Sequence, residues 1–148
     1  MTSKVDAVCV ALTALWQGLA DQVVDGPQAN SDASDEWLFV GADGDAPDEG
    51  AEAVAVEQEL MAFAKQQMET AEVTCAVVVR DGSSNPADLR ARAFEILDAA
   101  SAALRTDMSL SGLVMHAFVS GHTYMPVITQ GGSKARVVFT VTYQAQVT

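Results

Sequence analysis

The chain has 148 residues, 49% of them hydrophobic and 19% charged, which is enough to bury one core but too little for two full domains. No apolar run approaches the roughly 20 residues of a membrane span, and residues 1–20 carry Asp6 and lack the basic start of a signal peptide. We therefore expect one domain over residues 1–148, made in the cytoplasm and without membrane contact.

The net charge of −12 is unevenly distributed along the chain. The first 74 residues contain fifteen of the twenty acids and only two of the eight bases. Such a surface would be repelled by phosphate backbones, which argues against sequence-specific nucleic-acid binding. It is compatible with a surface that DNA slides past without adhering.

The first predicted element is an amphipathic helix within residues 3–24, with Ser3 as its N-cap. Its apolar stripe has helical spacing and consists of Val5, Val8, Cys9, Leu12, Leu15, Trp16 and Leu19. Residues 25–36 are rich in Gly, Pro, Asn, Ser and Asp and predict a loop. A short buried strand is expected at residues 37–41, which read WLFVG.

An acidic stretch follows, and we predict a flexible acidic loop around residues 42–52. Its five acids are Asp43, Asp45, Asp48, Glu49 and Glu52. A helix-loop-helix calcium site starting at Asp43 would need an oxygen ligand at Pro47, Gly at Asp48 and Glu at Val54, so three required positions fail. We predict a solvated loop with no metal site.

Two β-leaning segments come next, at residues 52–63 and 71–82. In the second, Val73, Cys75, Val77 and Val79 share one strand face. The first also fits a helical period through Val56, Leu60, Phe63 and Ala64, and we favour a strand there.

The clearest predicted element is a helix from Pro86 to Arg105. Asn85 is a good N-cap, Pro86 suits the first helical position, and Asp88 favours the positive helix end. Its buried stripe is expected to consist of Leu89, Ala93, Ile96, Leu97, Ala100 and Leu104.

Two antiparallel strands are expected near residues 113–121 and 136–146, joined by a turn at Gly131 and Gly132. In the second strand, apolar and polar side chains alternate. The predicted fold is α+β, with two helices packed on one face of a mostly antiparallel four- to five-stranded sheet.

Reactive residues do not form a catalytic pattern. Cys9 and Cys75 lie among apolar neighbours, which is typical of buried unpaired thiols. His116 and His122 are six residues apart, nominally on the same strand face, and lack a further ligand. Nucleophile-elbow, C-x-x-C, H-E-x-x-H and phosphate-loop motifs are absent from the sequence. We therefore expect no catalytic residue and no cofactor, and conclude that the chain is not an enzyme.

The second half of the chain resembles a known family. An arginine-bearing helix is followed by TDMSLSGLV at residues 106–114, a strand, a glycine-containing hairpin and a final strand of alternating Val and aromatic residues. This order is similar to the tail terminator proteins of long non-contractile-tailed bacteriophages, whose turn reads T-D-x-x-L-x-G-x-V. The resemblance covers most of the chain, most closely from about Glu72 onward. The acidic residues around 43–52 match no motif of that family.

The resemblance implies a virion structural protein and a ring-forming protomer, typically a hexamer. Such a ring caps the tail tube, binds the major tail tube protein and meets the head–tail connector and stopper proteins near the portal. DNA would be only passing cargo, and the site of action would be the head-proximal end of the tail.

Two surfaces are the candidate sites of such a ring. The acidic loop, with Asp43, Asp45, Asp48, Glu49 and Glu52, needs water around it, which leaves the channel or the outer rim of the ring. We favour the channel, where repulsion assists DNA passage. A polar strand edge with few charges is expected to pair between subunits, and it consists of Thr140, Thr142, Gln144 and Gln146. The alternative function is a small acidic module that binds a ligand or a divalent cation through the same loop.

Overall fold

The structure, a computed structural model, describes residues 3–26, 35–44, 53–60, 67–81, 85–129 and 132–147. Two helices and six strands follow one another along the chain: α1 (Val5–Leu15), β1 (Gln22–Asp25), β2 (Glu36–Val40), β3 (Val54–Leu60), β4 (Gln67–Asp81), α2 (Pro86–Thr106), β5 (His116–Thr129) and β6 (Gly132–Val147). The predicted α+β class is confirmed. Neither described helix is long and apolar enough to cross a membrane.

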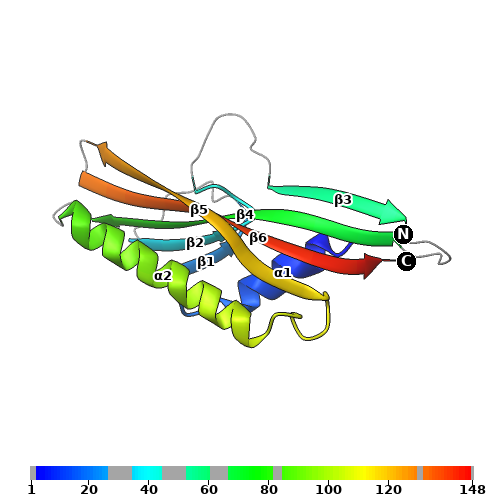
Figure 1. Cartoon of the computed structure of the whole chain (residues 1–148). Coiled ribbons are helices and arrows are strands. Elements are labelled where there is room, and N and C mark those ends of the chain that lie inside the picture. The colour runs from blue at the N-terminus through cyan, green and yellow to red at the C-terminus, as the bar shows by residue number, and fades with distance from the viewer. Residues whose placement is uncertain are drawn as a thin grey trace.

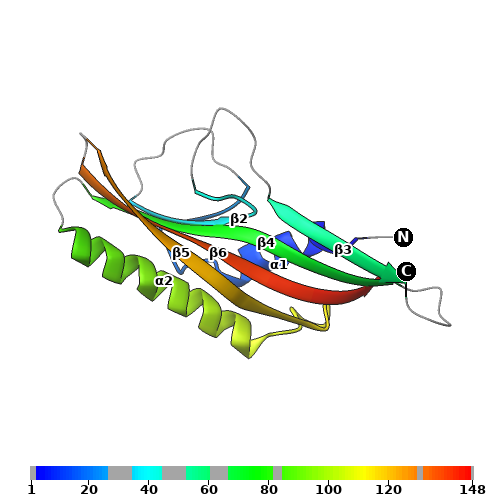
Figure 2. The same ribbon diagram turned by 45° about the horizontal axis from the view of Figure 1, so that its top comes forward.

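The six strands form one sheet in the order β1-β2-β4-β6-β5, and β3 also pairs with β4. β2 pairs with the second half of β4 and β3 with its first half. All pairs are antiparallel except the parallel pair β1–β2. Figures 1 and 2 show α1 and α2 on the same side of this sheet. We call the side with the helices the covered face and the other side the open face.

Alternation along β6 separates the two faces. The side chains that point to the covered face are buried against the helices: Ala135, Val137, Phe139, Val141, Tyr143, Ala145 and Val147. Both helices add their predicted stripes to the same core. Trp16, at the end of α1, is fully buried, donates from Nε1 to the carbonyl oxygen of Ala100 in α2 at 3.1 Å, and lies against Phe139. The core therefore joins both helices to the central strand.

The helix α2 agrees with its prediction within one residue. Asn85 Oδ1 accepts a hydrogen bond from the amide of Ala87 at 2.9 Å, and Pro86 is the first helical residue. All six residues of its predicted stripe are buried.

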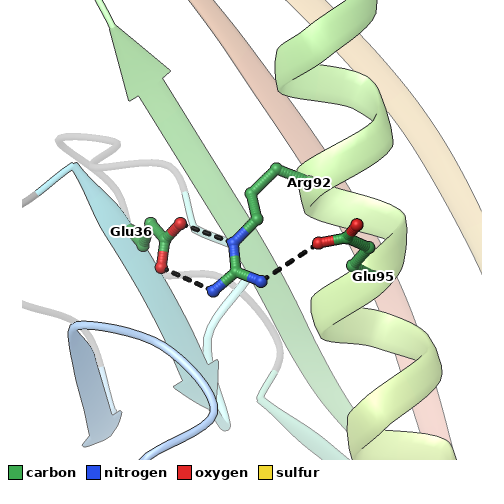
Figure 3. A network of polar contacts seen from close by, with 3 residues as sticks. All are labelled: Glu36, Arg92 and Glu95. Atoms are coloured by element: carbon green, nitrogen blue, oxygen red, sulfur yellow. Dashed lines mark hydrogen bonds and ion pairs between the residues drawn. The ribbon is translucent and has the colours of Figure 1, made fainter.

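An ion-pair network holds α2 beside β2. Figure 3 shows Arg92 of α2 reaching Glu36 of β2, with Nε–Oε2 and Nη2–Oε1 distances of 2.6 and 3.0 Å. Arg92 Nη1 also contacts Glu95 Oε2 at 3.2 Å. Two parallel hydrogen bonds fix the angle of the guanidinium as well as its distance, so this contact orients the helix over the sheet.

The first helix is shorter than predicted. α1 ends at Leu15, and Gly18 has a φ of 87°, a left-handed conformation that glycine adopts readily. Residues 22–25 then form β1, which raises the strand number to six. The N-cap is Lys4 rather than Ser3. The two predicted C-terminal strands are present and longer than expected, and β3 settles the open choice at residues 52–63 in favour of a strand over Val54–Leu60.

The turn between α2 and β5 contains the motif TDMSLSGLV of residues 106–114, and its geometry accounts for several residues of that motif. Leu110 and Ser111 have positive φ values of 50° and 59°, which are uncommon for residues other than glycine. Asp107 stabilises the turn, because its carboxylate accepts from the Ser111 amide at 2.9 Å. Leu110 and Val114 are buried beneath it. Asp107, Leu110, Ser111 and Val114 of this short motif thus have structural roles in the turn.

Replacing Leu97 by Ala tests the packing of α2. Leu97 is 4% exposed within the core, so the free energy of unfolding should fall by about 2–5 kcal/mol. Val10 on α1 is 57% exposed, and its replacement by Ala is the control, with an expected change of about 0.5 kcal/mol or less. Equal effects in denaturant titrations would contradict the assignment of the buried face.

Candidate functional site

The open face of the sheet is the candidate functional surface. On neighbouring strands, Thr70, Glu72 and Thr74 of β4 pair with Gln144, Thr142 and Thr140 of β6. Gln144 Nε2 donates to Thr70 Oγ1 at 3.4 Å. No described helix covers these polar side chains, which suits a surface that meets water or a partner.

The prediction that residues 140–146 form a free strand edge is wrong. Thr140, Thr142 and Gln144 lie on β6, which pairs with β4 on one side and β5 on the other, and Gln146 pairs with Met68 of β4. The backbone groups of β6 are therefore used within the protomer. The alternation and low charge of residues 140–146 do not distinguish an edge strand from an interior one, because periodicity carries no information on strand order. The sheet ends instead at β5 on one side and at β1 and β3 on the other.

Charge is separated along the open face. The exposed acids Glu57, Glu59 and Glu72 lie at the end formed by β3 and the first half of β4. The half-buried bases Arg80, Lys134 and Arg136 lie at the opposite end. The face therefore presents an acidic end, a neutral threonine-rich middle and a basic end.

The basic end holds the start of the acidic stretch. Arg136 Nε donates to the carbonyl oxygen of Asp43 at 2.6 Å, and Arg136 Nη2 lies 3.4 Å from Asp43 Oδ2. Gly44, with a φ of 77°, packs so closely on the sheet that an added Cβ would lie 2.8 Å from Val78 Cγ2 and 2.9 Å from Ala76 Cβ. Only glycine fits this approach, so the chain leaves β2 across the open face.

Of the five acids in the predicted acidic loop, the structure describes Asp43 alone. Asp43 lies on the open face in an ion pair. The other four acids, Asp45, Asp48, Glu49 and Glu52, lie outside the described residues.

A small apolar cluster lies beside this crossing. Trp37 and Phe39 of β2 stack with ring centroids 5.6 Å apart and pack with Ala76 and Val78 on the open face. Gly44 therefore packs against the apolar side chains of this second cluster, Ala76 and Val78.

A buried carboxylate on the covered face was missed in the sequence. Glu69 of β4 is fully buried and accepts four hydrogen bonds at 2.6–3.0 Å, from Ser3 Oγ, Lys4 N, Gln58 Nε2 and Tyr143 Oη. It therefore joins the start of α1 to β3, β4 and β6. The alternation of β4 could have indicated this burial, because Glu69 lies on the same strand face as Ala71, Val73 and Cys75.

The environment of Glu69 favours its charged form. Burial raises the pKa of the carboxyl, but the hydrogen bonds from Ser3, Lys4, Tyr143 and Gln58 outweigh burial and lower the pKa. The pKa of Tyr143 is raised by burial and by its hydrogen bond to Glu69. A tyrosine that stays protonated is a permanent donor to the carboxylate, so the cluster is an anchor for the N-terminal segment.

The histidines lie on opposite faces, contrary to the prediction. A bulge between Val119 and Gly121 inserts one residue into β5, so that His116 pairs with Gln144 on the open face and His122 with Phe139 on the covered face. His122 contacts the ring of Phe94. Across the described ranges, no group of three or more His, Cys, Asp or Glu could hold a metal ion.

The cysteines are buried and free, as predicted. Burial raises the pKa of the Cys9 thiol to about 11 and that of the Cys75 thiol to about 12. Both thiols are therefore protonated and unreactive at neutral pH.

The chain matches no protein-family model and no curated protein sequence. Its function must therefore be argued from its own residues and geometry.

Replacing Glu69 by Gln should destabilise the protein by about 1–3 kcal/mol at pH 7, since buried donors would lose their acceptor. The folded pKa of Glu69 is lowered, so its contribution is present above the unfolded value of about 4.3 and is lost as pH falls through the folded pKa. Urea titrations from pH 7 down to pH 3 should therefore show a smaller acid loss for Glu69→Gln than for the wild type. Glu72→Gln, at an exposed site on the same strand, is the control and should follow the wild type.

Calcium should not stabilise the protein through the acidic stretch. The Asp43 carboxylate is already paired with Arg136, and thermal melts with and without millimolar calcium should coincide. A specific site filled at 100 times its Kd would add about 2.7 kcal/mol, or several degrees in Tm. Such a rise, abolished by Asp43→Asn with Asp45→Asn, would favour the cation-binding alternative.

Proposed function

We propose that this chain is a virion structural protein, the tail terminator of a long-tailed bacteriophage. Copies of it form a ring, which binds the major tail tube protein on one side and the head–tail connector proteins on the other. DNA passes through the ring as cargo, and no reaction takes place.

The observation that carries this proposal is the one-sided sheet. Its covered face is filled by two helices, and its open face is free of described helices and largely polar apart from the cluster at Trp37 and Phe39. The resemblance in element order supports the same function, because α2, the turn at residues 107–114, β5 and β6 follow one another as in that family.

Charge gives the open face a use in such a ring. With this face turned inward, DNA phosphates would meet the exposed acids Glu57, Glu59 and Glu72 and the neutral threonines beside them. Like charges repel, so passing DNA would not adhere at this end. Asp43 lies on the same face at its opposite, basic end, where Arg136 binds it.

Removing the gene from its phage tests the proposal. Tails should grow to uncontrolled lengths or fail to join heads, while DNA replication and capsid filling continue, because the protein acts only where tail and head meet. Electron microscopy of lysates measures both outcomes, and the wild-type gene supplied in trans should restore virions. Normal virions without the protein would disprove the function.

A further inference from the structure

We propose that one copy of this chain binds the next by pairing the outer edge of β5 with the outer edge of β3. The occupant of each edge is thus a second copy of the same chain. This contact would be the subunit interface of the proposed ring, so the inference rests on the proposed function.

Both edges are open and lie on the same part of the sheet. In the described chain, β5 pairs only with β6, and β3 pairs only with β4. His116 of β5 is level with Glu57 of β3, since both are linked through the pair Gln144–Thr70. The four strands β3, β4, β6 and β5 therefore form one block with a free edge at each side.

Strand direction allows copies to add in the same orientation. Each neighbouring pair within this block is antiparallel, so β3 and β5 run in opposite directions. A second copy placed beside β5 without being turned over presents an antiparallel β3, which continues the ladder. The helices of both copies then lie on the same side. Such a head-to-tail contact can repeat and close into a ring.

Charge favours this pairing over the pairing of like edges. Two β3 edges would bring Glu57 and Glu59 against the same acids, which is unfavourable. β5 contains no Asp, Glu, Lys or Arg over residues 116–129, although charged side chains are a common means of preventing edge pairing. Its bulge and Pro126 come later, so residues 116–119 are left regular. The acidic edge thus fits the uncharged one.

The exposed side chains select a register. Leu60 is 71% exposed and Met115 is 54% exposed, although both are large and apolar. Setting Leu60 opposite Met115 in an antiparallel ladder places Val56 opposite Val119 on the covered face. It also places Glu59 opposite His116 on the open face, where a carboxylate and an imidazole attract when the imidazole is protonated. The register thus brings together two apolar pairs on the covered face and one polar pair on the open face, while Glu57 lies opposite Phe118 and Gln58 opposite Ala117.

Lysine substitutions at the two edges test the contact in the purified full-length chain. Leu60→Lys and Met115→Lys should each raise the protein concentration needed for self-association at least tenfold, because each variant buries a charge between strands. Light scattering over a concentration series measures this. Val10→Lys is the matched control, since Val10 is an apolar side chain that is 57% exposed and lies on α1 rather than on either edge strand. Circular dichroism must show that all three variants keep the wild-type fold. Wild-type protein that stays monomeric, or edge variants that associate like Val10→Lys, would overturn the proposal.

Disulfide cross-linking tests the register that sets Leu60 opposite Met115, and it adds no charged side chain. The double variant Leu60→Cys with Met115→Cys should give a ladder of disulfide-linked multimers on oxidation, whereas each single variant can give dimers at most. The native Cys9 and Cys75 are buried and do not contribute. A double variant of Val10→Cys with Met115→Cys should give no ladder, and an equal ladder from it would contradict the contact.

The two proposals can fail separately. If the edges pair but phage lacking the chain makes normal virions, the contact stands and the function is wrong. If tails require the chain but the edge variants assemble and cap them like the wild type, the function stands and the contact is wrong.

Discussion

The pairing of β4 with β6 is the constraint on which the rest of the structure depends. The two strands stay in register from Gln67–Val147 to Asp81–Ser133 without a described irregularity. Because side chains alternate, this long ladder fixes one apolar face over its whole length and a second face that is polar except at the small cluster of Trp37, Phe39, Ala76 and Val78. A slip by one residue would exchange the two faces, so the helices, the second cluster and the acid at Glu69 all depend on this register.

Polar contacts then decide where each covering element sits on the apolar face. Hydrophobic burial is not directional and lets a helix slide, whereas the paired hydrogen bonds of Arg92 to Glu36 have a fixed geometry. Glu69 does the same for the start of α1, with donors from three other segments. One contact is half-exposed and the other is fully buried, so the second is the more costly to break.

Local sequence patterns predicted where most helices and strands lie, but they could not predict which strands pair across long sequence distances. The helix after Asn85 and the alternation in β6 follow from neighbouring residues, and both are confirmed. The parallel pair of β1 with β2 and the central place of β6 depend on residues far apart in the chain. The bulge in β5 reversed the face of His122 because one added residue changes the alternation. For the candidate site, the sequence marked the acids but not the arginine that binds Asp43, which is 93 residues away.

The faces and the edges of this sheet are set by different properties of the sequence. Alternation sets the faces, and the presence or absence of charge on β3 and β5 determines which edges can meet. In an assembly built by the proposed pairing, each added copy would keep its orientation, so the open faces of successive copies would form one wall and the helices another. Asp43 is held to that open wall by Arg136. The same ion pair would therefore recur at equal intervals along that wall, so that each copy carries its Asp43 carboxylate already paired with Arg136.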